Sequence, residues 1–300
     1  MTSVVEVPTS FDDRSFEPFV AGLAALTAPG RVLIDAHATE WASPFGLVGL
    51  LCAGQALGVR LGAKPLLTVP ADREVAQYWA RTGFFAQAET LFEIHGAAPK
   101  AKADTDSPVL LEVTPVRVAG DVHRVVDRIQ TRSAAILDGE LGLDAKATIG
   151  FGMALSEACQ NIVEHAGTGG WVAVHAYTWR RRLGRRVVVI AVGDAGVGFR
   201  HTLEAAQARR YGDRWGDGAA LEAALIHGVS RFRDPGRGQG LRGIRMWMER
   251  WQGKLSIRSG TARIVRVPAW DEDVPLTGGL AAFPGAQLQL VIPGVAREER

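Results

Sequence analysis

The sequence predicts an α/β protein of two domains: a small α/β domain, followed by a two-layer α/β sandwich with helices on one face of a mixed sheet. The chain has 300 residues, and a single hydrophobic core rarely grows beyond roughly 250 to 300 residues. Hydrophobic residues make up 47% of the chain and charged residues 22%, as in a globular protein able to bury its cores. Strand-like and helix-like segments alternate in the first third, whereas helices and adjacent strands are mixed in the rest, and these two patterns favour different layer arrangements.

The first domain is predicted to span residues 1–96 and to contain a parallel sheet. Its β-like runs are 31–37 and 64–70, and its helix-like runs are 44–60 and 71–85. A strand, helix, strand, helix order predicts parallel pairing through right-handed crossovers. Trp79 and Phe84, in the second helix-like run, are the candidate core residues of this domain.

A linker at 97–108 and a second domain at 109–300 are predicted next. The linker (AAPKAKADTDSP) lacks large apolar side chains and carries proline near both ends, a composition typical of linkers. The pattern of the second domain predicts strands at 109–118, 171–179, 185–194, 254–259, 262–267 and 286–292, and helices at 121–138, 144–166, 200–210, 220–232 and after the glycines of 236–240.

Composition and charge narrow the functional classes. The net charge of +2 creates no field that favours nucleic acid or an anionic membrane, and the basic run 180–186 lies between two β-like runs, as at a hairpin tip. Cys52 and Cys159 form no CxxC pair, so they indicate buried free thiols rather than a zinc site or a disulfide framework. The sequence shows no signal-peptide pattern and no run of roughly 18 apolar residues. We therefore expect a cytoplasmic protein.

The run ALSEACQNIVEHAG, residues 154–167, places three polar side chains on one stripe of an apolar helix. Glu157, Asn161 and His165 are four residues apart, so they advance by only about 40° per step at about 100° per residue. Two interpretations fit this stripe. It is either the solvated face of a core helix or a face that presents ligands to a bound group.

Two glycine motifs in the same domain favour the second interpretation. GDAGVGF (193–199) ends an apolar strand, and GRGQGL (236–241) begins a helix. Glycines at this spacing allow close backbone approach, and a helix N-terminus directs free N–H groups at anions. GRGQGL matches neither the dinucleotide fingerprint nor the phosphate-binding P-loop, so each motif alone is also compatible with a simple turn.

In this order, the three motifs resemble the nucleotide-binding domain of the GHKL superfamily of histidine kinase-like ATPases. This superfamily includes gyrase, histidine-kinase catalytic domains, MutL and the anti-sigma serine kinases. The resemblance covers residues 108–293 and rests on E-x-x-x-N-x-x-x-H-A, D-x-G-x-G-F and G-x-G-x-G-L together. It implies a Bergerat-type sandwich that binds ATP and Mg²⁺.

The resemblance implies separate roles for the residues of the first motif. Asn161 matches the asparagine that coordinates Mg²⁺ between the phosphates, and Glu157 matches the acid that orients or deprotonates the attacking water or hydroxyl. His165 matches a histidine that either contacts phosphate or supports the end of the helix. The sequence leaves these two roles of His165 open.

The resemblance also assigns the glycine motifs. Asp194 matches the aspartate that accepts a hydrogen bond from the adenine amino group, and a tight turn beneath the base follows it. The glycines of the last motif match the hinge of a lid, residues 200–236, expected to be a mobile loop that closes over the phosphates. The nucleotide-binding residues implied by both motifs are Asp194, Gly196, Gly198, Phe199, Gly236, Arg237, Gly238, Gly240 and Leu241. Nearby arginines, Arg233, Arg237 and Arg242, either contact phosphate or lie on the surface.

Residues 1–96 resemble the STAS domain of anti-anti-sigma factors, mainly through VLIDAHATEWASPFGLVGLLCAGQAL. In that family a strand leads through a turn with two serines into an amphipathic helix. Pro44 and Phe45 stand where the two serines would be, and Ser43 comes one place too early. A phosphorylation switch is therefore not expected here. The domain is expected either to dock or dimerise, which makes a homodimer a candidate assembly, or merely to cover the sheet of the second domain.

Three functions follow from these resemblances. The first is an ATP-dependent regulator of a protein partner, either a serine kinase of the anti-sigma type or a nucleotide-gated binder, with an anti-anti-sigma or sigma-like regulator as partner. The second is an ATP hydrolase with a clamp cycle, which would need a further domain to supply a lysine. The third is a non-catalytic scaffold, against which Glu157 argues. His123 lacks the pattern of a phosphoacceptor helix, so a complete histidine kinase is not expected.

Overall fold

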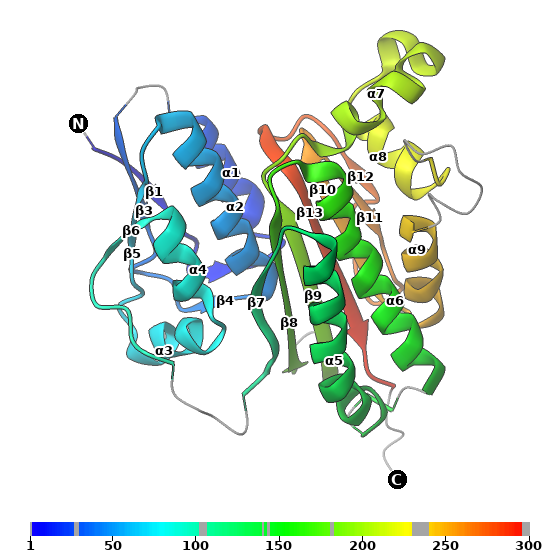
Figure 1. Cartoon of the computed structure of the whole chain (residues 1–300), viewed down its shortest axis with the longest axis horizontal. Coiled ribbons are helices and arrows are strands. Elements are labelled where there is room, and N and C mark those ends of the chain that lie inside the picture. Colours follow the sequence, from blue (N-terminus) through cyan, green and yellow to red (C-terminus); the bar gives the residue numbers. More distant parts are fainter. Residues whose placement is uncertain are drawn as a thin grey trace.

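The computed structural model shows a mixed α/β protein with four layers of secondary structure (Figure 1). A four-stranded sheet, a layer of helices, a seven-stranded sheet and a second layer of helices follow one another across the molecule. The structure describes residues 2–26, 30–101, 107–139, 141–142, 145–180, 183–229 and 240–295.

The first part of the chain contains a parallel sheet in the order β1-β3-β5-β6, and its three described pairings confirm the predicted parallel arrangement. Its strands are β1 (Thr2–Glu6), β3 (Arg31–Asp35), β5 (Leu66–Thr68) and β6 (Glu93–His95). Its helices are α1 (Phe16–Ala24), α2 (Pro44–Leu61), α3 (Arg73–Arg81) and α4 (Phe84–Leu91), and β2 (Ser10–Phe11) pairs separately with β4 (Trp41–Ala42).

Local sequence signals explain where these helices begin and end. The N–H of Gly46 donates to the side-chain oxygen of Ser43 at 3.1 Å, which caps α2, and Gly62 ends the helix with φ of 66°. The single helix predicted at 71–85 is wrong, because Gly83 adopts a φ of 73° and separates α3 from α4. Trp79 and Phe84 are fully buried, as predicted.

The second part contains a seven-stranded sheet in the order β12-β11-β10-β13-β9-β8-β7. Its strands are β7 (Val109–Val116), β8 (Gly170–Trp179), β9 (Arg185–Asp194), β10 (Lys254–Gly260), β11 (Ala262–Arg266), β12 (Leu276–Thr277) and β13 (Phe283–Pro293). All of its described pairings are antiparallel, so the predicted mixed sheet is wrong. The reason is that β13 pairs between β9 and β10, which run parallel to each other but do not touch.

Helices cover one face of this sheet, as predicted. They are α5 (Ala119–Gly139), α6 (Ala145–Asn161), a π-helical turn (Ile162–Ala166), α7 (Gly198–Tyr211), a 3₁₀ turn (Gly212–Arg214), α8 (Asp217–Leu225) and α9 (Gly240–Arg250). The helix predicted at 200–210 is confirmed by α7, and α8 covers the start of the one predicted at 220–232. The mobile loop expected over this part of the lid is therefore wrong. The predicted hairpin at the basic run is confirmed, because Trp179 of β8 pairs with Arg185 of β9.

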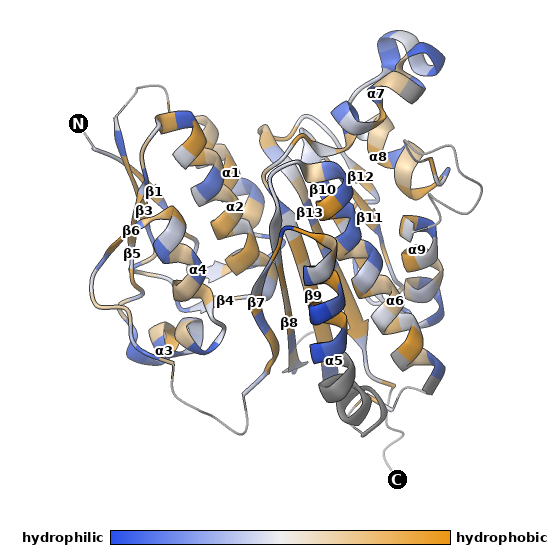
Figure 2. Cartoon of the chain, viewed as in Figure 1, coloured by the Kyte–Doolittle hydropathy of each residue, from blue (hydrophilic) through white to orange (hydrophobic). Residues whose placement is uncertain are grey.

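The opposite face of the seven-stranded sheet is covered by α2 and its neighbours from the first part (Figure 1). The hydropathy view shows hydrophilic and hydrophobic residues alternating along the helices (Figure 2), as in helices with one buried side. Within the described residues, α2 is the one helix long and apolar enough to cross a membrane, and 67% of it is buried inside the protein. This burial is that of a core helix. Cys52 on α2 and Cys159 on α6 are buried free thiols.

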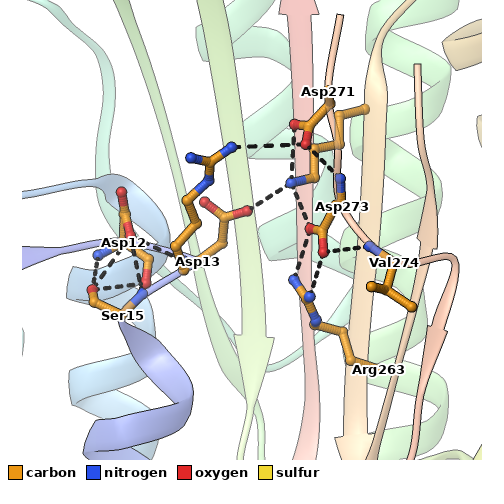
Figure 3. Close-up of polar contacts among 9 residues, drawn as sticks. Asp12, Asp13, Ser15, Arg263, Asp271, Asp273 and Val274 are labelled. Atoms are coloured by element: carbon orange, nitrogen blue, oxygen red, sulfur yellow. Dashed lines mark hydrogen bonds and ion pairs between the residues drawn. The ribbon is translucent and has the colours of Figure 1, made fainter. Parts of the chain in front are cut away.

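Buried ion pairs join the two parts beside strand β10. The ammonium of Lys254 lies 3.1 Å from Asp13, 3.2 Å from Asp271 and 2.8 Å from Asp273, and Arg263 holds Asp273 with two hydrogen bonds (Figure 3). Further along the same strand, the guanidinium of Arg258 donates two hydrogen bonds to the carboxylate of Glu17 on α1. Lys254 and Arg258 are each only 1% exposed.

Candidate functional site

A cavity of about 670 Å³ lies on the helical side of the seven-stranded sheet, within the size range of small-molecule sites. Helices α6, α7 and α9 and the ends of β9 and β13 contribute to its wall. Residues predicted from all three sequence motifs line it: Glu157, Asn161, His165, Asp194, Gly198, Phe199, Gly240 and Leu241. Among the implied catalytic and nucleotide-binding residues that the structure describes, Gly196 is the one that does not line this cavity.

The first motif spans a change of helix type. The α-helix ends at Asn161, a π-helical turn continues to Ala166, and Gly167 closes it with φ of 74°. π-Turns occur frequently at functional sites. Because the wider turn changes the angle between successive residues, the stripe predicted for a regular α-helix is not strictly kept, yet Glu157, Asn161 and His165 still line one cavity.

Asp194 ends β9 at the floor of the cavity and is only 6% exposed. The N–H groups of Gly196 and Ala286 donate to its carboxylate, the first at 2.8 Å. Burial nevertheless dominates and raises the pKa of Asp194 to about 6. The position therefore holds a carboxylate at neutral pH whose remaining acceptor capacity is directed at the cavity.

Glycines surround Asp194 because no larger residue fits. A Cβ at Gly285, where φ is 75°, would overlap the backbone and carboxylate of Asp194, and a Cβ at Gly196 would overlap the carbonyl of Ala166. Gly198 starts α7 with φ of 71°. The turn below Asp194 is thus packed backbone to backbone, which explains why Gly196 supports the floor rather than lining the cavity.

The third motif meets the first at Glu157. A Cβ at Gly240, the first residue of α9, would overlap the Glu157 carboxylate. Glycine at this position therefore allows the N-terminus of α9 to approach the acid of the first motif. A helix N-terminus beside a cavity is a favourable site for an anion.

Glu157 is partly buried, and its pKa is raised above its usual range by burial and, to a smaller extent, by the negative charge of Glu164. Glu164 accepts a hydrogen bond from the amide of Gln160 at 2.9 Å and lies 3.9 Å from the Nε2 atom of His165. His165 therefore contacts an acid of its own helix, in keeping with a supporting role.

Several lining residues were missed by sequence reasoning, although their spacing carried a signal. Gln160 and Glu164 follow Glu157 by three and seven positions, and Thr202 lies one helical turn after Gly198. Trp247 lies two turns into α9, against Gly150 of α6. Each of these residues lies on the same helix face as a predicted site residue. The cavity wall is therefore formed by whole helix faces and not by the motif residues alone.

The remaining predictions fall beyond the described parts of the chain. Gly236, Arg237, Gly238 and Arg233 lie outside the described residues. Arg242 is described and is exposed on α9, and the structure gives it no place in the cavity wall. Among the described residues, no group of three or more His, Cys, Asp or Glu side chains is arranged to hold a metal ion.

No protein-family model matches the chain, and no curated protein matches it. The cavity therefore brings together a buried carboxylate at its floor, an amide and a second carboxylate on one helix, and the first residue of α9, Gly240, packed against that second carboxylate.

Proposed function

We propose that the cavity binds ATP with Mg²⁺, and that the protein is a GHKL-type regulator that acts as a serine kinase on a protein partner. The observation that carries the proposal is the meeting of three sequence motifs, separated by up to 87 positions between Ala154 and Leu241, in the wall of one cavity. Residues that were merely turns or surface positions would have no reason to meet there.

Asp194 supplies the recognition of the base. Its buried carboxylate is an acceptor, and the exocyclic amino group of adenine is a donor, whereas guanine carries a carbonyl oxygen at the same ring position. A buried acceptor left without a donor costs roughly 1 to 3 kcal/mol. Asp194 is therefore expected to favour adenine over guanine.

Asn161 and the N-terminus of α9 supply the other end of the site. Magnesium is held by few protein ligands when phosphate oxygens and waters complete its shell, so one amide oxygen from Asn161 fits this donor set. The ion would neutralise charge on the phosphates. The free N–H groups at the start of α9 are expected to bind phosphate oxygens, and Gly240 keeps that helix end close to Glu157.

Glu157 is the proposed general base. Its raised pKa, caused mainly by burial, makes the carboxylate a better proton acceptor near neutral pH than an exposed glutamate. It would accept the proton of a partner's serine hydroxyl as that oxygen attacks the γ-phosphorus. The resulting products are a phosphoserine on the partner and ADP.

The first part is proposed to be a STAS-like module, residues 1–96, joined by residues 97–108 to the nucleotide-binding domain, residues 109–300. Ser43 is only 3% exposed and its side chain caps α2. A kinase would have to unfold the start of that helix to reach its hydroxyl, which supports a role for this module other than phosphorylation.

The test follows the label of γ-labelled ATP in the presence of Mg²⁺, with and without co-expressed candidate partners. Label on serine of a partner supports the kinase, whereas release as free phosphate replaces the kinase by a hydrolase. Glu157→Gln is expected to lower transfer by roughly 10²- to 10⁴-fold while ATP still binds. Arg128→Ala, on the outer side of α5, is the control and should transfer at the wild-type rate. Unchanged ATP binding in both Asn161→Ala and Asp194→Asn would refute the site.

A further inference from the structure

The four-stranded parallel sheet of the first part has one covered face and one open face. Its inner face packs against the helices that lie between the two sheets (Figure 1), and the side chains there are at most 5% exposed: Val5, Val32, Ile34 and Leu67. In Figure 1 no helix lies on the other side of this sheet. Parallel sheets are normally covered on both faces, so the open face calls for a partner.

The open face has an apolar row across its middle. The strand register aligns Val4 of β1, Leu33 of β3 and Leu66 of β5 side by side. Val4 is 54% exposed, and Leu33 and Leu66 are partly exposed. Alternation along each strand directs these three side chains away from the buried row.

Charged residues flank the apolar row, with opposite signs at its two sides. Arg31 lies two positions before Leu33 on β3. Asp35 lies two positions after Leu33, next to Glu6, which lies two positions after Val4 on β1. Glu93 lies at the β6 edge of the row, where Arg31 of the same copy binds it at 2.7 Å. Both members of that pair are more than half exposed.

We propose that this open face binds the same face of a second copy of the chain, in an isologous dimer. A two-fold axis along the apolar row places Val4, Leu33 and Leu66 against their own counterparts and reverses the strand direction. Arg31 of each copy then faces Asp35 and Glu6 of the other. A two-fold axis along the strands would instead place Val4 opposite Glu93 of the other copy. It would also place the side of the row that carries Arg31 opposite the same side of the other copy, so the charges favour the first arrangement.

The dimer is independent of nucleotide binding, because the open face belongs to the first part and the cavity to the helical layer on the far side of the seven-stranded sheet. It leaves both cavities facing outward. It therefore assigns a role to the first part without altering the proposed reaction.

The test is the molar mass of the full chain in solution, measured by sedimentation velocity over a range of micromolar concentrations. The wild type is expected to be a dimer, and Leu33→Glu, which places two carboxylates face to face, is expected to raise the dimer dissociation constant by at least about tenfold. Val59→Glu, on a residue of α2 that is 83% exposed, is the matched control and should remain dimeric.

A charge exchange tests the orientation of the two copies. Arg31→Glu is expected to weaken the dimer by roughly tenfold, and Arg31→Glu combined with Asp35→Arg is expected to restore most of the wild-type affinity. Circular dichroism and thermal unfolding of each variant report whether it folds. A monomeric wild type would overturn the proposal, as would a Leu33→Glu variant that folds and dimerises like the wild type. Failure of the double variant to recover would overturn the proposed axis.

Discussion

The two faces of the seven-stranded sheet differ most clearly at strand β10, where buried charges are confined to one face. Leu255 and Ile257 point toward the helices and join a large apolar core. The alternating residues Lys254, Ser256 and Arg258 point toward the first part and are buried, and Lys254 and Arg258 have acidic partners there. Both faces therefore bury apolar side chains, and the face toward the first part adds buried ion pairs that require one geometry.

This difference between the two faces explains why the site lies on the helical side. Apolar packing is non-directional, so the helical face can enclose a cavity while α6, α7 and α9 still bury their inner sides. Buried ion pairs lose strength when one partner moves or is lost. The first part is therefore expected to stay fixed on the sheet and to hold the floor beneath Asp194 from behind, where Val48 and Cys52 of α2 lie next to Gly193.

The largest effect is expected from Lys254→Ala. This change leaves the carboxylates of Asp13 and Asp271 buried with less compensating charge, and breaking a buried pair costs about 3 to 5 kcal/mol. Urea unfolding measures the loss. Arg128→Ala removes an ion pair with Glu112 whose side chains are 54% and 37% exposed, and it should cost at most about 1 kcal/mol. Equal losses of unfolding free energy in the two variants would show that the buried ion pairs stabilise the protein no more than a surface pair does.

A pH-dependent effect is expected from His175, which faces the first part and contacts the hydroxyl of Tyr78 at 2.9 Å. Burial lowers its pKa from 6.5 to about 3, so the unfolded chain binds a proton that the folded chain refuses between these values. The free energy of unfolding therefore falls as pH decreases below about 6.5. His175→Gln should remove this dependence and gain roughly 2 to 3 kcal/mol relative to the wild type near pH ~4.5. Parallel pH profiles of the two proteins would contradict this.

The helical face should show the opposite sign at Asp194. Its pKa is raised from 3.8 to about 6, so the folded chain holds a proton that the unfolded chain has lost, and stability falls as pH rises between these values. Above pH ~6, Asp194→Asn should be more stable than the wild type by roughly 2 to 3 kcal/mol, while its affinity for ATP decreases. Thermal unfolding from pH ~4 to ~8 measures this, and a stability difference that does not vary with pH would argue against the buried carboxylate.

The smallest effect concerns two glycines with nearly the same backbone. Gly285 has φ of 75° and Gly279 has φ of 72°, but a Cβ at Gly285 would overlap Asp194, whereas a Cβ at Gly279 meets nothing within 4 Å. Gly279→Ala should cost only the left-handed penalty of about 1 kcal/mol. Gly285→Ala should cost at least about 1 kcal/mol more and should weaken ATP binding. Equal losses of stability in the two variants would show that the floor of the cavity can accommodate a Cβ at Gly285, against the packing described here.

Much of the site could be predicted from the sequence, because its residues have chemical requirements that leave a pattern. Glycines that leave no room for a Cβ, such as Gly196, and a polar stripe on an apolar helix can both be recognised in the sequence. The predicted residues within the described chain accordingly line the cavity or, for Gly196, support its floor.

The errors share a different cause, which is that pairing between distant segments leaves no local signal. Insertion of β13 between β9 and β10 made the sheet antiparallel. The contact between Asp13 and Lys254 joins residues 241 positions apart, and neither residue is unusual in its own segment. The expectation of a mobile loop at residues 200–236 was wrong for residues 200–225 although helices were predicted there, because the glycines and charges suggested mobility while Leu203 and Leu221 pack in the core.

The most direct test of the central claim is calorimetric titration of the wild type and Asp194→Asn with ATP and with GTP, in the presence of Mg²⁺ at pH ~7.5. At this pH Asp194 is ionised in the folded chain, since its pKa is about 6. The wild type is expected to bind ATP and to bind GTP at least about tenfold more weakly. The affinity of Asp194→Asn for ATP is expected to be lower than that of the wild type by a similar factor, while the variant remains folded. Equal affinity of the wild type for both nucleotides, together with unchanged ATP binding in Asp194→Asn, would contradict the account.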